Sequence, residues 1–419
     1  MSPINVVILN DYGFINGGAA QVAVTTALEM ARDENFHIYL FCAVPPIDPR
    51  LQGHPQVTVI CTNQGDILFS PDRIKASMQG LWNLTSAKAM KELLTSLRPE
   101  GTIIHVHGWT KALSHSPISI AMQAGFPILL TVHDYFLACP NGGFYNYQRD
   151  EVCTLTAMSP RCLLTHCDAR SYAQKLWRVT RQFIQKNVAH LPSRISEFIV
   201  LSHLSSEIMQ PYLPAEAHIH YLPNPIETSE QERVEAEKNT SFIVVGRLSS
   251  EKGLDLFARA ARELGVKAEF IGDGPIRNDL KTIYPEAHFT GWLSRHELAG
   301  RLRGARVLVF PSKLYEAQGL VISEAASVGI PSIISDITAG KELINDHETG
   351  LLFRANSQAS LMEKMQEMMD NTLVQRLSDN VYQHFWQNPP TYTKYASELS
   401  EIYNKIIGPG RGIPQASGD

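Results

Sequence analysis

Residues 242–253 read FIVVGRLSSEKG: a short apolar run passes directly into a loop that begins and ends with glycine, and a segment with helical spacing follows. A buried strand, a loop and an amphipathic helix in this order make one βα unit of a parallel sheet. The stretch therefore predicts that an α/β domain begins near residue 240.

The same alternation of apolar runs and helical segments extends along nearly the whole chain. Such runs, between helices, are typical of parallel strands that are buried on both faces. The predicted strands are Asn5–Leu9, His37–Phe41, Thr102–Val106, Ile128–Val132 and Phe198–Leu201, then Phe242–Val245, Ala268–Ile271, Val307–Phe310 and Ser332–Ile334. Two series of this size predict an α/β fold of two Rossmann-like, doubly wound parallel-sheet domains.

The break between the two series lies near Leu222–Thr240, where prolines and a charged stretch interrupt the rhythm. We therefore expect an N-terminal domain over 1–222 and a C-terminal domain over 223–387. The segment 388–407 has helical spacing and is expected to pack back on the N-terminal domain. The tail 408–419, rich in Gly and Pro, is expected to be disordered.

Composition excludes several classes of protein. The 419 residues include 37 Lys and Arg against 42 Asp and Glu, a formal charge of −5, and 44% are hydrophobic. These values exclude a disordered or coiled-coil chain and give no reason to expect nucleic-acid binding. The sequence shows no signal peptide, no apolar run long enough for a membrane span and only six cysteines, so we expect a cytoplasmic protein with reduced thiols.

Several loops that follow predicted strands carry residues suited to a phosphorylated ligand. The pair Gly17 and Gly18 precedes a helix, where backbone N–H groups can face an anion. Arg247 and Lys252 lie on the loop quoted above and suit a diphosphate. The alternatives are an ordinary strand–helix turn and a solvated loop.

A second group of residues suits a nucleotide and its sugar. Gly272 and Gly274 form a turn after a strand, where a base or ribose could rest. Glu324 falls on an otherwise apolar helix face, and a ribose diol is a good partner for a carboxylate there, although a capping or salt-bridged Glu is the alternative. The loop before this helix contains Glu316, and the helix start, with free N–H groups, comprises Gly319, Leu320 and Val321.

These motifs, in this order, resemble the family 4 glycosyltransferases of the GT-B fold. The resemblance rests on Gly17-Gly18, the strand-end His133, the loop 246–253, Gly272-Asp-Gly-Pro and the pair Glu316/Glu324. It implies transfer of a hexose-type sugar from a nucleotide-diphosphate sugar, of UDP or GDP type, with retention of configuration. The implied acceptor is a hydroxyl of a glycan, a lipid-linked or a small molecule.

The resemblance also implies roles for single residues. Arg247 and Lys252 would hold the donor diphosphate, Glu324 the ribose hydroxyls and Glu316 the transferred sugar. His133 would lie beside the reacting sugar, and Gly18 would approach the donor from the opposite domain. We expect no metal in catalysis and a front-face transfer in which the departing phosphate accepts the acceptor's proton.

The chain departs from the family pattern at two places. The family usually reads Glu-Pro-Phe-Gly, whereas here Glu316 and Gly319 enclose Ala-Gln. The linker usually ends Pro-Asn-Gly, whereas here it reads Pro223-Asn-Pro225, which should stiffen the hinge. Two other functions fit the same fold: a nucleotide-sugar binding or regulatory subunit, and a sugar epimerase.

Two further segments carry unusual composition. Cys139, Cys153, Cys162 and Cys167 crowd into one long loop, which leaves structural zinc, free thiols and a disulfide as alternatives. The basic stretch 170–190 predicts a helix that lies on an anionic membrane at its cytoplasmic face, or one with a solvated charged face and a core face.

Overall fold

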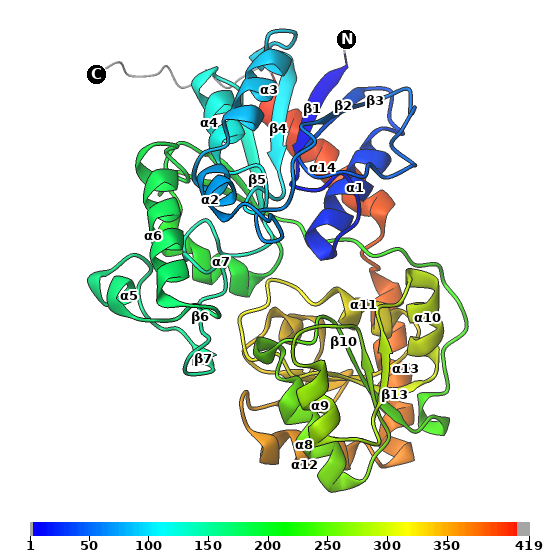
Figure 1. Ribbon diagram of the computed structural model, residues 1–419. Helices are drawn as coiled ribbons and strands as arrows, with labels where there is room; N and C mark the ends of the chain where they lie inside the picture. The colour runs from blue at the N-terminus through cyan, green and yellow to red at the C-terminus, as the bar shows by residue number, and fades with distance from the viewer. Residues whose placement is uncertain (1–2, 409–419) are drawn as a thin grey trace.

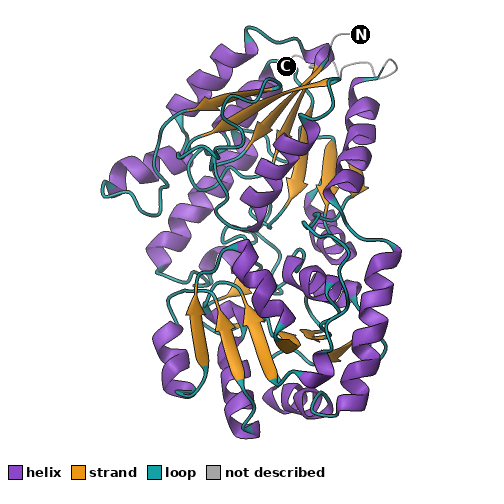
Figure 2. Ribbon diagram, turned by 90° about the vertical axis from the view of Figure 1, so that its right-hand side faces the viewer, coloured by secondary structure: helices purple, strands orange, loops and turns teal. Residues whose placement is uncertain are grey.

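Two α/β domains, one above the other in Figure 1, make up the computed structural model, which describes residues 3–408. Each domain is built on one parallel sheet, and Figure 2 shows helices on both faces of each sheet.

The N-terminal sheet has seven parallel strands in the order β3-β2-β1-β4-β5-β8-β9. The strands are β1 Ile4–Leu9, β2 Phe36–Cys42, β3 Val57–Cys61, β4 Thr102–Val106, β5 Ile128–Val132, β8 Glu197–Val200 and β9 His218–Tyr221. The helices are α1 Gly18–Met30, α2 Arg73–Leu81, α3 Leu84–Leu94, α4 Ser116–Gln123, α5 Pro160–Leu164, α6 Tyr172–Asn187 and α7 His203–Met209. A small hairpin, β6 Tyr145–Asn146 with β7 Glu151–Val152, lies with α5 and α6 in the long segment between β5 and β8.

The C-terminal sheet has six parallel strands in the order β12-β11-β10-β13-β14-β15. The strands are β10 Ser241–Val245, β11 Ala268–Ile271, β12 His288–Gly291, β13 Ala305–Phe310, β14 Ser332–Ser335 and β15 Gly350–Phe353. The helices are α8 Leu254–Leu264, α9 Arg277–Ile283, α10 Arg295–Arg303, α11 Leu320–Ser327, α12 Gln358–Glu367, α13 Asn371–Gln387 and α14 Tyr392–Ile407.

Helix α14 crosses back to the N-terminal domain and packs beside α1 (Figure 1). Its residues Tyr395, Leu399 and Tyr403 are buried in the same apolar cluster as the strands β1 and β2. The chain therefore crosses between the domains twice, once before β10 and once before α14, and these two crossings form the hinge.

Glycines allow the loops at the carboxyl ends of the C-terminal strands to pack backbone against backbone. Gly253 has φ +65°, and a Cβ there would lie 2.0 Å from the carbonyl oxygen of Pro311. Gly272 has φ +134°, and its Cβ would lie 2.0 Å from the carbonyl oxygen of Gly246. Only glycine combines these dihedral angles with such close contact, so the two predicted ligand loops form one compact surface.

The predicted fold of two parallel-sheet α/β domains is confirmed, and all nine predicted strands are present with boundaries within two residues. Four further strands of the two large sheets were missed, β3, β9, β12 and β15, as was the small hairpin β6–β7. All four lie at sheet edges, and three of them have at most one buried residue. The predicted disordered tail lies, apart from Gly408, outside the described residues.

None of the helices within residues 3–408 is both long enough and apolar enough to cross a membrane.

We predict that Gly253→Ala lowers the free energy of unfolding by more than Gly265→Ala. Both glycines have nearly the same left-handed backbone, φ +65° and +63°, but Gly265 has open space around its Cα. Gly265→Ala should therefore lose only about 1–2 kcal/mol through backbone strain, whereas Gly253→Ala also forces apart the loops that meet at Pro311. Urea unfolding measures both; equal losses would contradict the close packing described here.

Candidate active site between the domains

The start of α1 in the N-terminal domain faces the start of α11 in the C-terminal domain. Gly17, with φ +103°, precedes α1, and Gly18 lies against Leu320, because a Cβ at Gly18 would be 3.7 Å from its Cδ1. Gly319 precedes α11, so Leu320 and Val321 form the first turn of that helix. The first N–H groups of a helix have no partner within the helix. Two glycine-led helix starts therefore meet between the domains, and a helix start of this kind can bind an anion.

Lys252 and Glu316 come from neighbouring strand-end loops and form an ion pair between Lys252 Nζ and Glu316 Oε1. Ser312 Oγ donates a hydrogen bond of 2.7 Å to the same carboxylate oxygen. Both side chains of the ion pair remain partly exposed, 30% for Lys252 and 14% for Glu316. The pair therefore has a fixed geometry and still faces solvent, where a ligand can reach it.

Arg247 lies on the same loop as Lys252 but forms no ion pair with a carboxylate of residues 3–408. Its side chain is exposed, and its charge acts on Tyr147 of the opposite domain. Gly274 packs against the backbone of Leu248, with a Cβ position only 2.3 Å from the carbonyl oxygen of that residue. The loop therefore presents one cation without a partner beside one that is paired.

Glu324 lies in the second turn of α11 and has no ion pair or side-chain hydrogen bond within the described part of the chain. Burial raises the pKa of this carboxyl above its ordinary value, although the nearby Arg295 acts in the opposite direction. Arg295 itself is engaged by Glu227 and by Tyr392 Oη. A largely buried carboxylate without a partner is costly, so the position favours a ligand that donates hydrogen bonds.

Three histidines form a connected row at the carboxyl ends of β4 and β5. His107 Nδ1 lies 3.0 Å from His133 Nε2, and the rings of His105 and His107 lie 4.1 Å apart. His105 also contacts Tyr403 Oη at 2.6 Å and Thr131 Oγ1 at 2.8 Å. Burial lowers the pKa of His105 to about 3 and that of His133 to about 4. All three rings are therefore neutral near pH 7, because burial also holds the pKa of His107 well below its ordinary value.

Asp11 holds the N-terminal side of the site together, a role that its sequence context did not signal. Its carboxylate accepts hydrogen bonds of 2.8 Å from the backbone N–H groups of Lys111, Ala112 and Leu113. The carboxylate therefore fixes the loop after β4 against the loop after β1.

Several contacts that the sequence gave no sign of join the two domains. Lys313, which is 6% exposed, pairs with Asp150 of the N-terminal domain at 2.6 Å and with Asp255 of its own domain at 3.1 Å. Glu342 accepts hydrogen bonds of 2.9 and 2.8 Å from the first two N–H groups of α7. No spacing motif marks such side chains, because their partners in the other domain are more than 100 residues away.

Gln318 explains one departure from the family pattern. Its Oε1 accepts from the backbone N–H of Asn224 at 2.8 Å, and its Nε2 donates to the carbonyl of the same residue at 3.2 Å. The residue that stands where the family usually has Phe is therefore the one that fastens the loop before α11 to the hinge.

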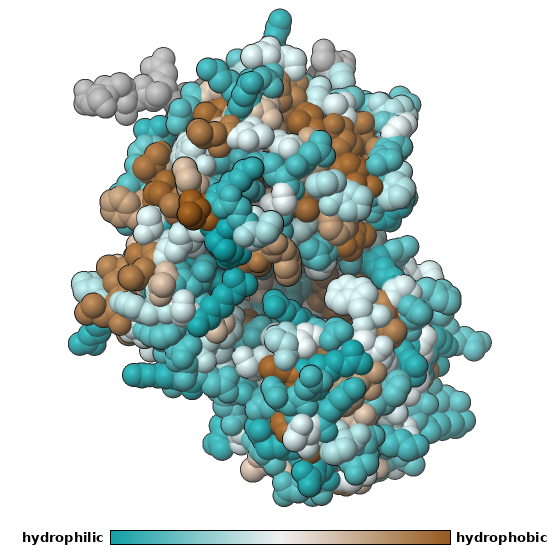
Figure 3. Space-filling view, viewed as in Figure 1, coloured by the Kyte–Doolittle hydropathy of each residue, from teal (hydrophilic) through white to brown (hydrophobic). Residues whose placement is uncertain are grey.

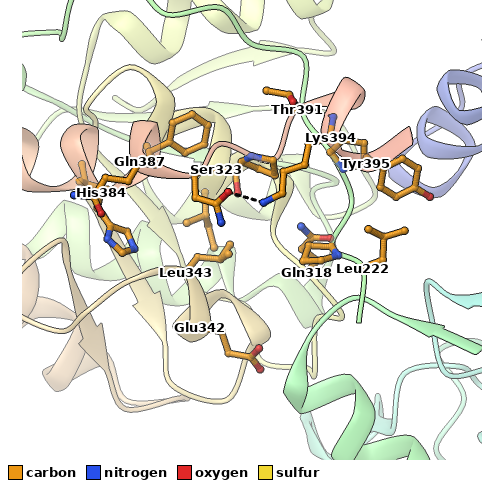
Figure 4. A pocket seen from close by; sticks show the side chains of 18 of the residues that line it. Leu222, Gln318, Ser323, Glu342, Leu343, His384, Gln387, Thr391, Lys394 and Tyr395 are labelled. Atoms are coloured by element: carbon orange, nitrogen blue, oxygen red, sulfur yellow. Dashed lines mark hydrogen bonds between the residues drawn. The ribbon is translucent and has the colours of Figure 1, made fainter. Parts of the chain in front are cut away.

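A cavity of about 330 Å³ lies on the hinge side of α11 (Figure 4). It is lined by the first crossing, by Ile322 and Ser323 of α11, and by the second crossing around Pro390. Neither Glu324 nor the Lys252–Glu316 pair lines it. The cavity therefore belongs to the hinge and is not the candidate site itself.

The four cysteines weighed as zinc ligands lie around a lysine and an asparagine. Within residues 3–408 no group of three or more His, Cys, Asp or Glu side chains is arranged to hold a metal ion, and all six cysteines are free. The ammonium of the fully buried Lys175 lies 3.2 Å from Cys167 Sγ and 3.6 Å from Cys162 Sγ. Cys139 Sγ donates instead to Asn141 Oδ1, and Cys153 is only partly buried. A buried cation among the thiols opposes a second, metal cation there.

The second half of the chain carries a recognisable family pattern. Residues 225–384 match the family Glycosyl transferases group 1. Among curated proteins, an alpha-D-kanosaminyltransferase of Streptomyces kanamyceticus is 29% identical over 195 residues, which are 42% of this chain and 48% of that protein. The UDP-Gal:alpha-D-GlcNAc-diphosphoundecaprenol alpha-1,3-galactosyltransferase of Escherichia coli is 31% identical over 193 residues, 42% of this chain and 49% of that protein. The chain thus spans about half the length of the curated relatives it matches.

Solved structures share the whole fold. Sucrose-phosphate synthase of Thermosynechococcus elongatus superposes with a TM-score of 0.70 at 18% identity, over 96% of this chain and 99% of that one. HepE of Anabaena in complex with UDP gives a TM-score of 0.63 at 16% identity, over 96% and 100%. At these identities the comparison establishes the fold, and the predicted GT-B architecture is confirmed.

We predict that stability falls as the pH drops from about 6.5 to about 4, partly through His115. Burial and the nearby Arg181 lower its pKa from 6.5 to about 4. The unfolded chain therefore takes up this proton before the folded chain does, and the free energy of unfolding decreases by up to about 1.4 kcal/mol per pH unit in this range.

In His115→Gln, the free energy of unfolding should depend less on pH, by the uptake of nearly one proton. Urea unfolding at several pH values measures this slope. His296→Gln, at an exposed position, is the control and should leave the slope unchanged. An unaltered slope in His115→Gln would mean that this ring takes up its proton equally in both states.

Proposed function

We propose that the protein is a retaining glycosyltransferase that moves a hexose-type sugar from a nucleotide-diphosphate sugar to a hydroxyl acceptor. The observation that carries this proposal is the carboxylate of Glu324, which is largely buried, lacks a partner among the described residues and lies beside the start of α11. A ribose diol supplies the two hydrogen-bond donors that such a group requires.

Two parts of the C-terminal domain would hold the donor diphosphate. Lys252 and Arg247 supply two positive charges from the loop after β10. The helix start at Gly319, Leu320 and Val321 supplies backbone N–H groups. Charge that develops on the departing diphosphate is stabilised by these groups without a metal ion.

Front-face transfer is favoured over a covalent intermediate. Glu316 is engaged by Lys252 and by Ser312, so it is an oriented hydrogen-bond acceptor for sugar hydroxyls and not a free nucleophile. A retaining reaction through a covalent intermediate needs a second carboxylate at the reacting carbon. With Glu316 engaged, the proton of the acceptor hydroxyl would pass to the departing phosphate.

His133 would line the sugar side of the site as a neutral hydrogen-bonding group. Its low pKa, about 4, and its contact with His107 keep the ring uncharged and oriented. A neutral ring accepts or donates one hydrogen bond to a sugar hydroxyl. Gly17 and Gly18 would approach the donor from the N-terminal domain, which also carries His133.

The relatives support a nucleotide-sugar donor without fixing its base. One is named for UDP-Gal and another, from Corynebacterium glutamicum, is a GDP-mannose-dependent alpha-mannosyltransferase. We therefore propose a donor of UDP or GDP type and a glycan or lipid-linked acceptor, with the protein at work in the cytoplasm, in polysaccharide biosynthesis.

We predict that Glu324→Gln selectively weakens recognition of the ribose. A hydrogen bond to a charged group contributes about 1.5–3 kcal/mol, so the native protein should bind the ribonucleoside diphosphate roughly 10–100 times more tightly than its 2′,3′-dideoxy analogue. The variant should lose most of this ratio. Isothermal calorimetry with UDP, GDP and their dideoxy analogues measures it, and Glu286→Gln, at an exposed position in the same domain, is the control.

Turnover distinguishes the proposed reaction from its alternatives. Incubated with a donor sugar alone, a transferase should release nucleoside diphosphate slowly and leave the sugar unchanged, whereas an epimerase would return an isomerised donor. Transfer is supported if acceptor hydroxyls accelerate the release of nucleoside diphosphate and if Lys252→Met and Arg247→Met abolish this release. Tight binding with no release under any condition would instead identify a binding or regulatory subunit.

A further inference from the structure

Helix α6 has its polar and apolar sides inverted. Its fully buried residues are Lys175, Arg181, Gln182 and Gln185, whereas Leu176 and Phe183 are 47% and 59% exposed. A surface helix in water normally buries its apolar stripe and exposes its charges. The alternative predicted from sequence, a solvated charged face over an apolar core face, is therefore wrong for this helix.

The buried polar side of α6 is held by contacts within the protein, although Arg181 Nη2 and Gln182 Oε1 find no hydrogen-bond partner among the described residues. Gln182 and Gln185 both donate to the carbonyl of Leu137, at 2.9 and 3.0 Å. The guanidinium of Arg181 lies 4.9 Å from the ring centre of Phe136. The orientation of the helix is thus fixed by the interior, and its apolar side is left facing outward.

Helix α2 lies beside α6 and extends this outward side. Trp177 Nε1 donates to the carbonyl of Ser77, and its ring covers Gly80 so closely that a Cβ there would lie 2.7 Å from it. Tyr172 Oη donates to the carbonyl of Leu163, which joins α5 to the start of α6. The three helices therefore share one side of the N-terminal domain (Figure 1).

Large apolar residues project from this side, and we name them the apolar face. Each is between 47% and 84% exposed, and they are Phe69, Ile74, Met78, Leu164, Leu176 and Phe183. Figure 3 shows hydrophobic residues gathered at the left of the N-terminal domain, over these helices. A monomeric protein in water rarely exposes so many large apolar side chains together.

Positive charges lie on the same segments as the apolar face. The exposed cations of the segments 68–84 and 158–194 are Arg73, Lys75, Arg161, Arg170, Lys186 and Arg194, and none forms an ion pair with a carboxylate of the described chain. The exposed acid of these two segments is Asp72, which caps α2. Exposed apolar side chains on the same segments as unpaired cations match the boundary between acyl chains and anionic headgroups.

We propose that α2, α5 and α6 form a docking face for an anionic lipid bilayer. The apolar face inserts among the acyl chains nearest the headgroups, and the exposed cations of the same segments pair with lipid phosphates. Because no described helix can span a bilayer, the attachment is peripheral and reversible. The proposal does not depend on the transfer reaction.

Co-sedimentation of the full chain with vesicles tests this docking. Vesicles of phosphatidylcholine with phosphatidylglycerol should retain the protein at about 0.05 M salt and release much of it at about 0.5 M, because salt screens the headgroup attraction. Vesicles of phosphatidylcholine alone should bind it more weakly. No binding to anionic vesicles at low salt overturns the proposal.

Variants separate the two contributions. The double variant Leu176→Ser, Phe183→Ser should lower vesicle affinity by about tenfold or more. The double variant Arg170→Gln, Lys186→Gln should lower it by about fivefold per charge, and high salt should remove this second effect. Met369→Ser changes an apolar residue that is 52% exposed in the other domain and should have no effect.

Urea unfolding shows whether each variant remains folded. Light scattering then separates the bilayer from a second copy of the chain. If the native protein is a dimer that does not bind vesicles, and the Leu176→Ser, Phe183→Ser variant is a monomer, the face serves self-association. That result overturns the proposal.

Discussion

The buried ammonium of Lys313 lies where the two domains meet, and the geometry of the site depends on it. It pairs with Asp150 on one domain and Asp255 on the other. Burial alone would raise the pKa of Asp255, but Lys313 and Arg259 hold it below its ordinary value. An ammonium so enclosed cannot lose either partner without a large desolvation penalty. The contact therefore fixes the hairpin β6–β7 against α8, beside the loop that carries Arg247 and Lys252.

The polarity of the two sheets explains why chemistry gathers in one place. Parallel strands all end at the same edge, so the loops after β10, β11 and β13 must share a small area. Gly253 and Gly272 let these loops touch through their backbones. Side chains from distant parts of the sequence, such as Lys252 and Glu316, are thereby brought into contact, and the hinge held by Gln318 keeps that edge facing the N-terminal domain.

Charge is distributed unevenly across the site. The C-terminal side offers cations and a helix start, whereas the N-terminal side offers neutral rings, because burial suppresses protonation of His107 and His133. Such a division suits a ligand with an anionic part and a part made of hydroxyls. The inverted polarity of α6 adds an outward apolar surface on the same domain, so ligand and bilayer would meet different sides of one scaffold.

The sequence by itself determined the two parallel sheets, their central strands and the residues at their carboxyl ends. Continuous apolar runs mark strands that are covered on both faces, and glycines mark the loops between them. It missed the edge strands β3, β9 and β12, since a half-exposed strand loses that continuous run. Only the tertiary structure decided which side of α6 faces outward, which cation occupies the cysteine cluster and which lysine joins the domains. Those outcomes depend on contacts between residues far apart in the chain, and local pattern carries no record of them.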